Sequence, residues 1–154
     1  MIALLPTPSA SYTLVEELRE LSSPLAVRRA GANDPEWEEL ALAKLGARGW
    51  GRILHFRQFY QKGWGDHRGQ SLSPRAFEAF IRFLGEAEFP KSNKPPSVFL
   101  TDRGGIELCW EAPSGKALQA EFTRTGVEYF NEETSAEGVT GIADWQLLKQ
   151  LLAV

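Results

Sequence analysis

The sequence predicts an α+β domain with N-terminal helices, then a four- to five-stranded antiparallel meander, then a C-terminal helix packed on one face of the sheet. Two patterns support this fold class. From Pro96 to Phe130, short runs of alternating apolar and polar residues are separated by glycine-bearing turns that are too short for a parallel crossover. On both sides of that stretch, apolar residues recur at helical spacing. With 154 residues and 43% hydrophobic content, we expect a single domain over 1–154.

The first part of the chain contains two helix start signals. Residues 1–11 have the composition of an irregular lead-in, and a capping box then predicts a short helix over Thr13–Leu21. Asp34-Pro35-Glu36 opens a second helix, which we expect to end near Gly49. The segment 51–60 is compatible with helix or strand, and its apolar spacing favours helix.

A glycine-rich loop is expected over 61–72, followed by the most regular helix pattern of the chain. Ser73-Pro74 is a strong start signal, and the apolar stripe of that helix comprises Phe77, Phe80, Ile81 and Leu84. A loop of this length either moves, binds or is held by its own tryptophan, Trp64. The proline-rich segment 90–96 is a linker into the meander.

The meander is expected over 97–131, with one apolar face beneath the helices. Alternation places Ile106, Leu108 and Trp110 on the same face as Phe122, and these residues are the predicted core of the sheet. The opposite face is predicted to carry glutamates, namely Glu107, Glu111, Glu121 and Glu128. We also expect a short edge strand over 139–142 and a terminal helix over 143–152, capped by Asp144.

Charge is distributed unevenly along the chain, although its formal net charge is only -3. Residues 40–96 hold ten basic and four acidic side chains, whereas residues 97–154 hold four basic and nine acidic ones. The folded protein is therefore expected to present two surfaces of opposite sign. The alternative is solvated surface charge that partly neutralises itself where helices pack beside the sheet.

The sequence lacks the signatures of common enzyme classes. It contains no G-x-S-x-G elbow, P-loop, Rossmann fingerprint, H-E-x-x-H or CxxC pair. With only His55 and His67 available beside one cysteine, we expect neither a metal site nor a cofactor. Cys109 lies in the middle of a predicted strand, where a nucleophile has no free backbone amides for an oxyanion hole. The glutamate face could hold a cation or a carboxylate pair, or consist of solvated side chains.

The expected cellular compartment follows from the absence of long apolar segments. No run approaches the roughly 18 to 20 apolar residues that a membrane span needs, and 1–6 lacks the features of a signal peptide. A single cysteine also suits a reducing compartment. We therefore expect a cytoplasmic protein without a membrane partner.

The succession GWGDHRGQSLSPRAFEAFIRFL, PPSVFLTDRGGIELCWEA and ALQAEFTRTGVEYF resembles a group of small uncharacterised bacterial proteins. In that group a Gly-Trp-Asp-Gly loop precedes a Ser/Thr-Pro helix, and a Gly-x-x-x-Leu-x-Trp-Glu strand follows. The resemblance covers about half of the chain, from Trp50 to Phe130. It implies a bacterial origin and a fold, but no activity. The chain departs from the pattern where Gly65 stands between Trp64 and Asp66.

Three hypotheses about function follow. The one we favour is a non-enzymatic binding protein, accessory, immunity or antitoxin-like, that engages a protein through the 61–72 loop and a charged face. The contact candidates in that loop are Trp64, Asp66, His67 and Arg68. The second hypothesis is nucleic-acid binding through the basic region 40–96, whose candidates are Arg48, Arg52, Arg57, Lys62 and Arg75. The third is an enzyme of unrecognised type that uses Asp66 and His67.

Overall fold

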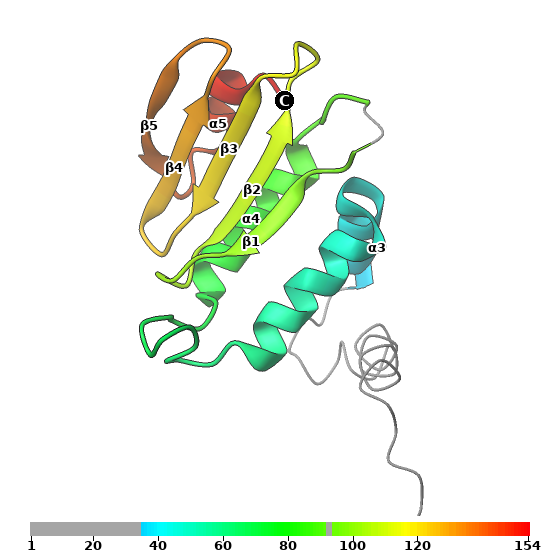
Figure 1. The fold of residues 1–154 in the computed structure, drawn as a ribbon. Helices are drawn as coiled ribbons and strands as arrows, with labels where there is room; N and C mark the ends of the chain where they lie inside the picture. The colour runs from blue at the N-terminus through cyan, green and yellow to red at the C-terminus, as the bar shows by residue number, and fades with distance from the viewer. Residues whose placement is uncertain (1–34, 92–93) are drawn as a thin grey trace, which may run out of the picture.

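The structure, a computed structural model, confirms the α+β class and describes residues 35–91 and 94–154. The lead-in 1–11 and the helix expected over Thr13–Leu21 lie outside the described residues. The elements, in chain order, are α3 (Pro35–Phe59), α4 (Pro74–Glu86), β1 (Ser97–Leu100), β2 (Ile106–Glu111), β3 (Ala117–Phe122), β4 (Gly126–Asn131), β5 (Ala136–Gly141) and α5 (Trp145–Leu152). The five strands form one sheet in sequence order, and every neighbouring pair is antiparallel (Figure 1).

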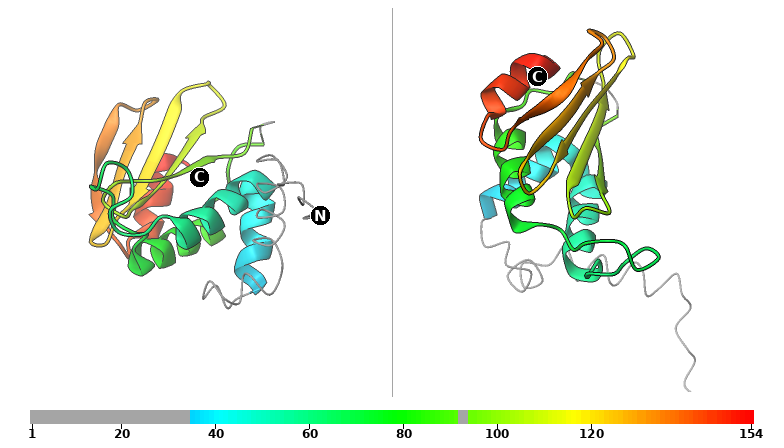
Figure 2. Two further views of the ribbon diagram at one scale, coloured as in Figure 1. Left: turned by 60° about the horizontal axis from the view of Figure 1, so that its bottom comes forward. Right: turned by 90° about the vertical axis from the view of Figure 1, so that its left-hand side faces the viewer.

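The helices lie on one side of the sheet. Helix α4 contacts β2 and β3, α5 contacts β4, β5 and α4, and α3 lies against β1 and α4. Figure 2 shows α4 and α5 on one side of the sheet in its right-hand view, with no helix of the described residues on the other side. We call this uncovered side the open face. The helix-covered side holds the core.

The core is built from the apolar faces that alternation predicts. The predicted core residues of β2 and β3 are buried, as are the apolar stripe of α4 and two leucines of α5. Phe122 is central, because its ring centroid lies 5.6 Å from that of Phe80 and 5.3 Å from that of Phe83. Burying large aromatic side chains between a sheet and a helix is the main stabilisation available to a domain of this size.

The helix starts follow their sequence signals to different degrees. Ser73 caps α4, because its Oγ accepts a hydrogen bond from Ala76 N at 3.4 Å and Pro74 follows it directly. Asp144 occupies the N-cap position of α5, but its side chain makes no capping hydrogen bond. The first turn of α5 therefore depends on packing of the helix rather than on this cap.

The expected helix end near Gly49 is wrong. The interruption lies at Gly46, whose φ of 72° and ψ of 174° are non-helical, and the helix resumes and runs to Phe59. The helical interpretation of 51–60 is correct. Glycine costs about 1 kcal/mol in a helix interior. Burial of Trp50, Ile53 and Leu54 offsets that cost here.

The last strand is longer and begins earlier than expected. Strand β5 pairs with β4 over all six residues, from Asn131↔Ala136 to Gly126↔Gly141. The side chain of Asn131 shapes the preceding turn, because its Oδ1 accepts hydrogen bonds from Glu133 N at 2.9 Å and Thr134 N at 3.2 Å. Ala136–Gly141 has two glycines and no clear alternation, so the sequence indicates a strand only over the apolar end of this segment and not from Ala136.

Candidate functional site

The loop of residues 61–72 is closed by its own backbone. Gly63 N donates to Gly69 O at 2.7 Å, and Gly69 N donates to Trp64 O at 2.8 Å. Within that closure, Arg68 N donates to Gly65 O at 3.1 Å. The loop is thus a compact turn rather than an open excursion of the chain.

Trp64 holds this loop together from inside. Its indole Nε1 donates to Gln70 O at 2.6 Å, and its ring packs edge-on against Tyr60 with centroids 4.9 Å apart. The side chain is half-buried. Trp64 is therefore the internal support of the loop, one of the roles the sequence left open, and the exposed contact surface consists of its neighbours.

The tip of the loop presents Asp66, His67 and Arg68, all of them exposed. Asp66 has a φ of 51° and His67 a φ of 66°, so two consecutive non-glycine residues adopt the left-handed conformation. Such residues cost on the order of 1 kcal/mol each and persist where the surroundings hold them. The structure thus brings three of the four candidate loop residues together at one tip.

The base of the loop is anchored on the turn between β1 and β2. Gln70 N donates to Asp102 O and Ser73 N donates to Gly104 O, both at 2.8 Å. Gly104 has a φ of 74°, and a Cβ at this position would collide with the carbonyl oxygen of Ser71. Glycine is therefore required where the loop meets the turn.

The same turn carries Arg103, which reaches onto the open face. Its guanidinium lies 2.5 Å from Glu121 Oε2 and 2.8 Å from Glu128 Oε1. Glu121 and Glu128 are direct cross-strand partners, so Arg103 neutralises two like charges that face each other. The hydrogen bonds that Arg103 donates to Glu128 and Glu121 raise the pKa of Arg103, and those to Glu128 lower the pKa of Glu128.

A second polar network occupies the middle of the open face. Gln119 Nε2 donates to Glu107 Oε1, and Cys109 Sγ donates to the same oxygen at 3.4 Å. Burial, followed by the charge and hydrogen bond of Glu107, raises the pKa of Cys109 to about 12. The thiol is therefore protonated at neutral pH, which removes it as a nucleophile. Glu111, on the same strand and face, is exposed.

Exposed apolar side chains lie among these glutamates. On the open face, Phe99 is 38% exposed, Phe130 37% and Val139 71%. The guanidinium of Arg52 on α3 stacks over the Phe99 ring at 4.7 Å. The open face therefore combines negative charge with apolar contact area.

The open face is hollowed beside Cys109. A cavity of about 270 Å³ is lined by Lys94, Pro95, Ser97, Cys109, Trp110, Glu111, Ala117, Leu118 and Gln119. Ser97, Cys109 and Gln119 are cross-strand partners on β1, β2 and β3, and the small side chains in this region leave the space. We call this space the Cys109 hollow. The alternation of apolar and polar residues along the strands predicts which face each residue occupies. It does not predict that the side chains on that face leave a space.

The basic candidates do not form one surface. Arg48 is exposed on α3, and Arg52 is drawn to the β1 edge by Phe99. Arg57 lies on nearly the opposite side of α3 from both. Its Cζ is 4.5 Å from the centroid of the Phe77 ring on α4. Burial in this position lowers the pKa of Arg57. Lys62 and Arg75 are exposed at the start of the loop and in the first turn of α4. For the three arginines on α3, their spacing along the helix already indicates that Arg57 lies on a different side from Arg48 and Arg52.

A larger cavity of about 400 Å³ lies between α3 and α4, and the sequence did not predict it. It is lined by Trp37, Arg57, Gln61, Ser71, Leu72, Pro74, Phe77 and Glu78. The edge-on contact of Trp37 with Phe77, at 6.0 Å between centroids, forms part of its wall. Its residues are spread along the chain from Trp37 to Glu78, so no local sequence pattern marks it.

Within residues 35–91 and 94–154, no group of three histidine, cysteine or acidic side chains is arranged to hold a metal ion. No helix in those ranges is long and apolar enough to cross a membrane. In comparisons with protein-family models, curated proteins and solved structures, nothing matched this chain.

Proposed function

We propose that this chain is a small non-enzymatic binding protein, accessory, immunity or antitoxin-like, that engages a protein partner through the 61–72 loop and the open face. One observation carries the proposal. The hydrogen bonds Gln70–Asp102 and Ser73–Gly104 tie the loop to the turn whose Arg103 holds two open-face glutamates. The loop tip and the glutamate row are thereby parts of one preorganised surface.

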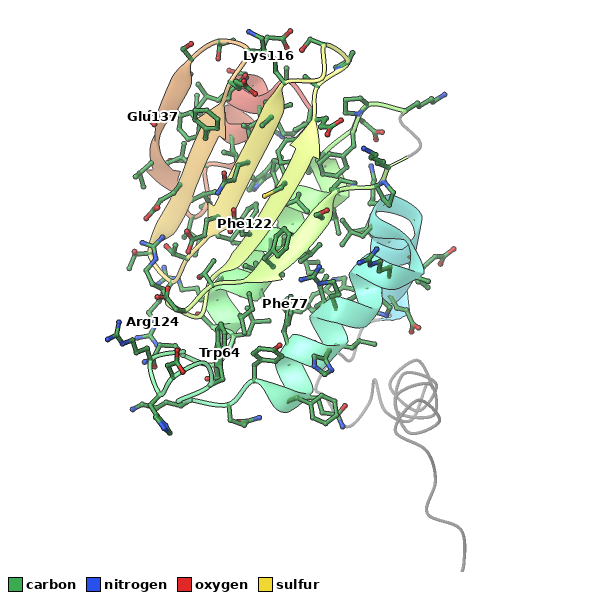
Figure 3. The ribbon with its side chains drawn as sticks, in the orientation of Figure 1. Trp64, Phe77, Lys116, Phe122, Arg124 and Glu137 are labelled. Atoms are coloured by element: carbon green, nitrogen blue, oxygen red, sulfur yellow. The ribbon has the colours of Figure 1, made fainter. Side chains whose placement is uncertain are left out.

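The position of the loop supports joint use of these two parts. In the right-hand view of Figure 2, the loop after α3 projects on the side of the open face. Figure 3 shows Trp64 and Arg124 at the same end of the sheet, with Lys116 at the other end. A partner resting on the open face would meet the tip residues Asp66, His67 and Arg68 without rearrangement of the loop. Preorganisation of this kind reduces the entropy cost of association.

The chemistry of the candidate residues favours binding over catalysis. Asp66 and His67 are both exposed, and neither lines the two cavities described above. General acid–base groups work in sites that exclude water, where their pKa values are tuned by burial. Cys109 is a protonated thiol within a strand. These observations give an enzymatic interpretation no support at the loop or on the sheet.

The sign of the charge favours a protein over a nucleic acid. The open face carries a row of glutamates, which repels phosphates. Of the basic candidates on α3, Arg52 lies at the β1 edge and Arg57 on the α4 side. Exposed aromatic side chains such as Phe99 and Phe130 are typical of protein interfaces. A protein partner can complement both the glutamate row and the exposed aromatic side chains.

The test is affinity capture of the tagged protein from the organism that encodes it. A tip variant, Asp66→Asn, His67→Asn and Arg68→Gln, removes the charges while retaining residues that tolerate the left-handed conformation. The control variant, Gln146→Ala and Gln150→Ala, changes exposed residues of α5 on the covered side. We expect one stoichiometric protein partner with the wild type and the control, and none with the tip variant. Purification of the wild type alone, or equal capture by the tip variant, contradicts the proposal.

A further inference from the structure

We infer that the partner contributes a basic segment that lies across the open face and inserts one lysine or arginine side chain into the Cys109 hollow. This inference rests on the proposed function and specifies the chemistry of the partner. It is carried by the size of the hollow, by the charge around it and by the apolar side chains that flank it.

The hollow has the dimensions of a site for one side chain. Ligand pockets for drug-sized molecules begin at about 300 Å³, and the hollow encloses about 270 Å³. Its floor is formed by Ser97, Cys109 and Ala117, whose short side chains leave room between β1, β2 and β3. The side chains of Trp110 and Leu118 point into the core on the other face, so the rest of the lining comes from Pro95, Gln119 and the stems of Lys94 and Glu111. An extended aliphatic stem fits this lining better than a compact polar ligand.

The charge beside the hollow selects a cationic head group. Glu107 and Glu111 flank Cys109 on the same strand and the same face. Glu111 is exposed and makes no ion pair with any residue of the described ranges. Lysine and arginine bury their aliphatic stems while their charged ends remain at the surface. Glu111 is the carboxylate available to pair with such an end, and Lys94 lines the same hollow.

The whole face discriminates among possible occupants by charge. Strand register places Glu107, Glu111, Glu121, Glu128 and Glu137 on this face. Arg103 from the β1–β2 turn already bridges two of them. A second copy of this chain would bring the same negative charges, and nucleic acid or an anionic bilayer would be repelled as well. A basic protein segment is the occupant whose charge complements the face.

Apolar anchors lie where such a segment would cross the sheet. Phe130 is the direct cross-strand partner of Gln119, which lines the hollow, and Phe99 follows Ser97 on the same face of β1. Both rings are more than a third exposed. A segment that alternates basic and apolar residues would therefore contact carboxylates and aromatic rings together.

The inference is tested by NMR titration of the whole ¹⁵N-labelled protein with a synthetic ten-residue peptide that alternates arginine and leucine. The control peptide carries glutamate in place of arginine. We expect saturable shift changes at the amides of Ser97, Cys109 and Gln119 with the basic peptide and none with the acidic one. Shift changes confined to the loop, to α5 or spread over all surface carboxylates would overturn the inference.

Two variants and a control sharpen the result. Cys109→Phe fills the hollow and Glu111→Lys reverses its charge, and each is expected to weaken peptide binding at least tenfold. Glu86→Lys, an exposed site on α4, makes the same charge change as Glu111→Lys and is the matched control expected to bind like the wild type. If Cys109→Phe fails to fold, the charge pair decides alone. Binding that is unchanged in Glu111→Lys contradicts the inference.

Affinity capture with Glu111→Lys separates this inference from the proposed function. A partner that is retained by Glu111→Lys but lost by the tip variant would overturn the inference and leave the proposed function intact. The absence of any partner with the wild type would remove the proposed function, whatever the peptide does. Loss of the partner in both variants supports the two together.

Discussion

The indole of Trp64 lies directly against the backbone of Gly69, so closely that a Cβ at position 69 would stand 2.5 Å from Cδ2 of the ring. Gly69 also accepts from Gly63 N and donates to Trp64 O, which places both residues at the neck of the loop. This contact keeps Asp66, His67 and Arg68 at a fixed tip, and it is the most direct target for testing the loop.

Gly69→Ala is expected to destabilise the protein by about 1–3 kcal/mol, because the added methyl overpacks the contact with Trp64. Equilibrium urea unfolding measures the effect as a lowered midpoint at unchanged slope. Gly115→Ala is not a suitable control, because Gly115 has a positive φ of 84° and Gly69 does not. An unchanged midpoint for Gly69→Ala would show that the ring moves aside without cost.

Trp64→Phe tests the indole hydrogen bond to Gln70 O separately from the ring contact. The loss of one hydrogen bond is expected to cost about 0.5–1.5 kcal/mol and to speed amide exchange at Gly69. Trp145→Phe on α5 is the matched control, since Trp145 is also half-buried but lies away from the loop. Equal exchange rates at Gly69 in the wild type and Trp64→Phe would contradict the supporting role.

Two glycines of α3 are expected to respond to alanine in opposite directions. Gly46 has a φ of 72°, so Gly46→Ala should lose about 1–2 kcal/mol of stability through the left-handed conformation. Gly51 has helical geometry and no atom within 4 Å of an added Cβ, so Gly51→Ala should gain about 0.5–1 kcal/mol. Thermal unfolding of the two variants checks both signs, and a shift of both in the same direction would contradict the kink at Gly46.

Arg103→Met is expected to remove a pH-dependent part of the stability. Because Arg103 lowers the pKa of Glu128 from 4.5, the pair stabilises the fold above that pH and loses its effect as pH falls through the lowered pKa. At pH 7 the variant should lose at most about 1 kcal/mol, because the pair is exposed. Urea unfolding at pH 7 and at about pH 2.5 should show this difference shrinking.

Arg82→Met is the control for that comparison, since it breaks only the exposed Glu78–Arg82 pair within α4. It should change stability by no more than about 0.5 kcal/mol. An Arg103→Met variant that is equally destabilised at both pH values would show that Arg103 acts through packing rather than through its charge.

Cys109 is expected to react slowly with iodoacetamide. With its pKa raised from 9.0 to about 12, the thiolate fraction at pH 8 is roughly a thousandfold below that of an ordinary cysteine. Glu107→Gln removes the charge that contributes to this shift, so the variant should react faster while burial still slows it. Mass spectrometry of the intact protein follows the rate. Alkylation of the wild type at the rate of a free thiol would contradict the raised pKa.

Much of the fold was predictable because its signals are local. Alternation in Ile106–Glu111 and the capping pattern at Ser73 need only neighbouring residues, and both predictions are confirmed. Strand β5 was misplaced because its residues alternate weakly and pair only after the turn at Asn131 forms. The expected end of the helix near Gly49 was wrong for a related reason. Three glycines follow one another closely, and only the packed structure selects Gly46 as the one that interrupts the helix.

The features of the candidate site likewise differ in whether local sequence signals predict them. Spacing and turn residues act locally, and they suffice to place the glutamates on one face and to predict a glycine-rich loop that contains Trp64 and its polar neighbours. The support of the loop by Trp64 and the bridge from Arg103 to Glu121 and Glu128 arise only when the chain packs. The same packing separates Arg57 from Arg52, because each stacks on a ring of a different element. Such contacts depend on how distant segments pack, and residue spacing along one segment carries no information about that packing.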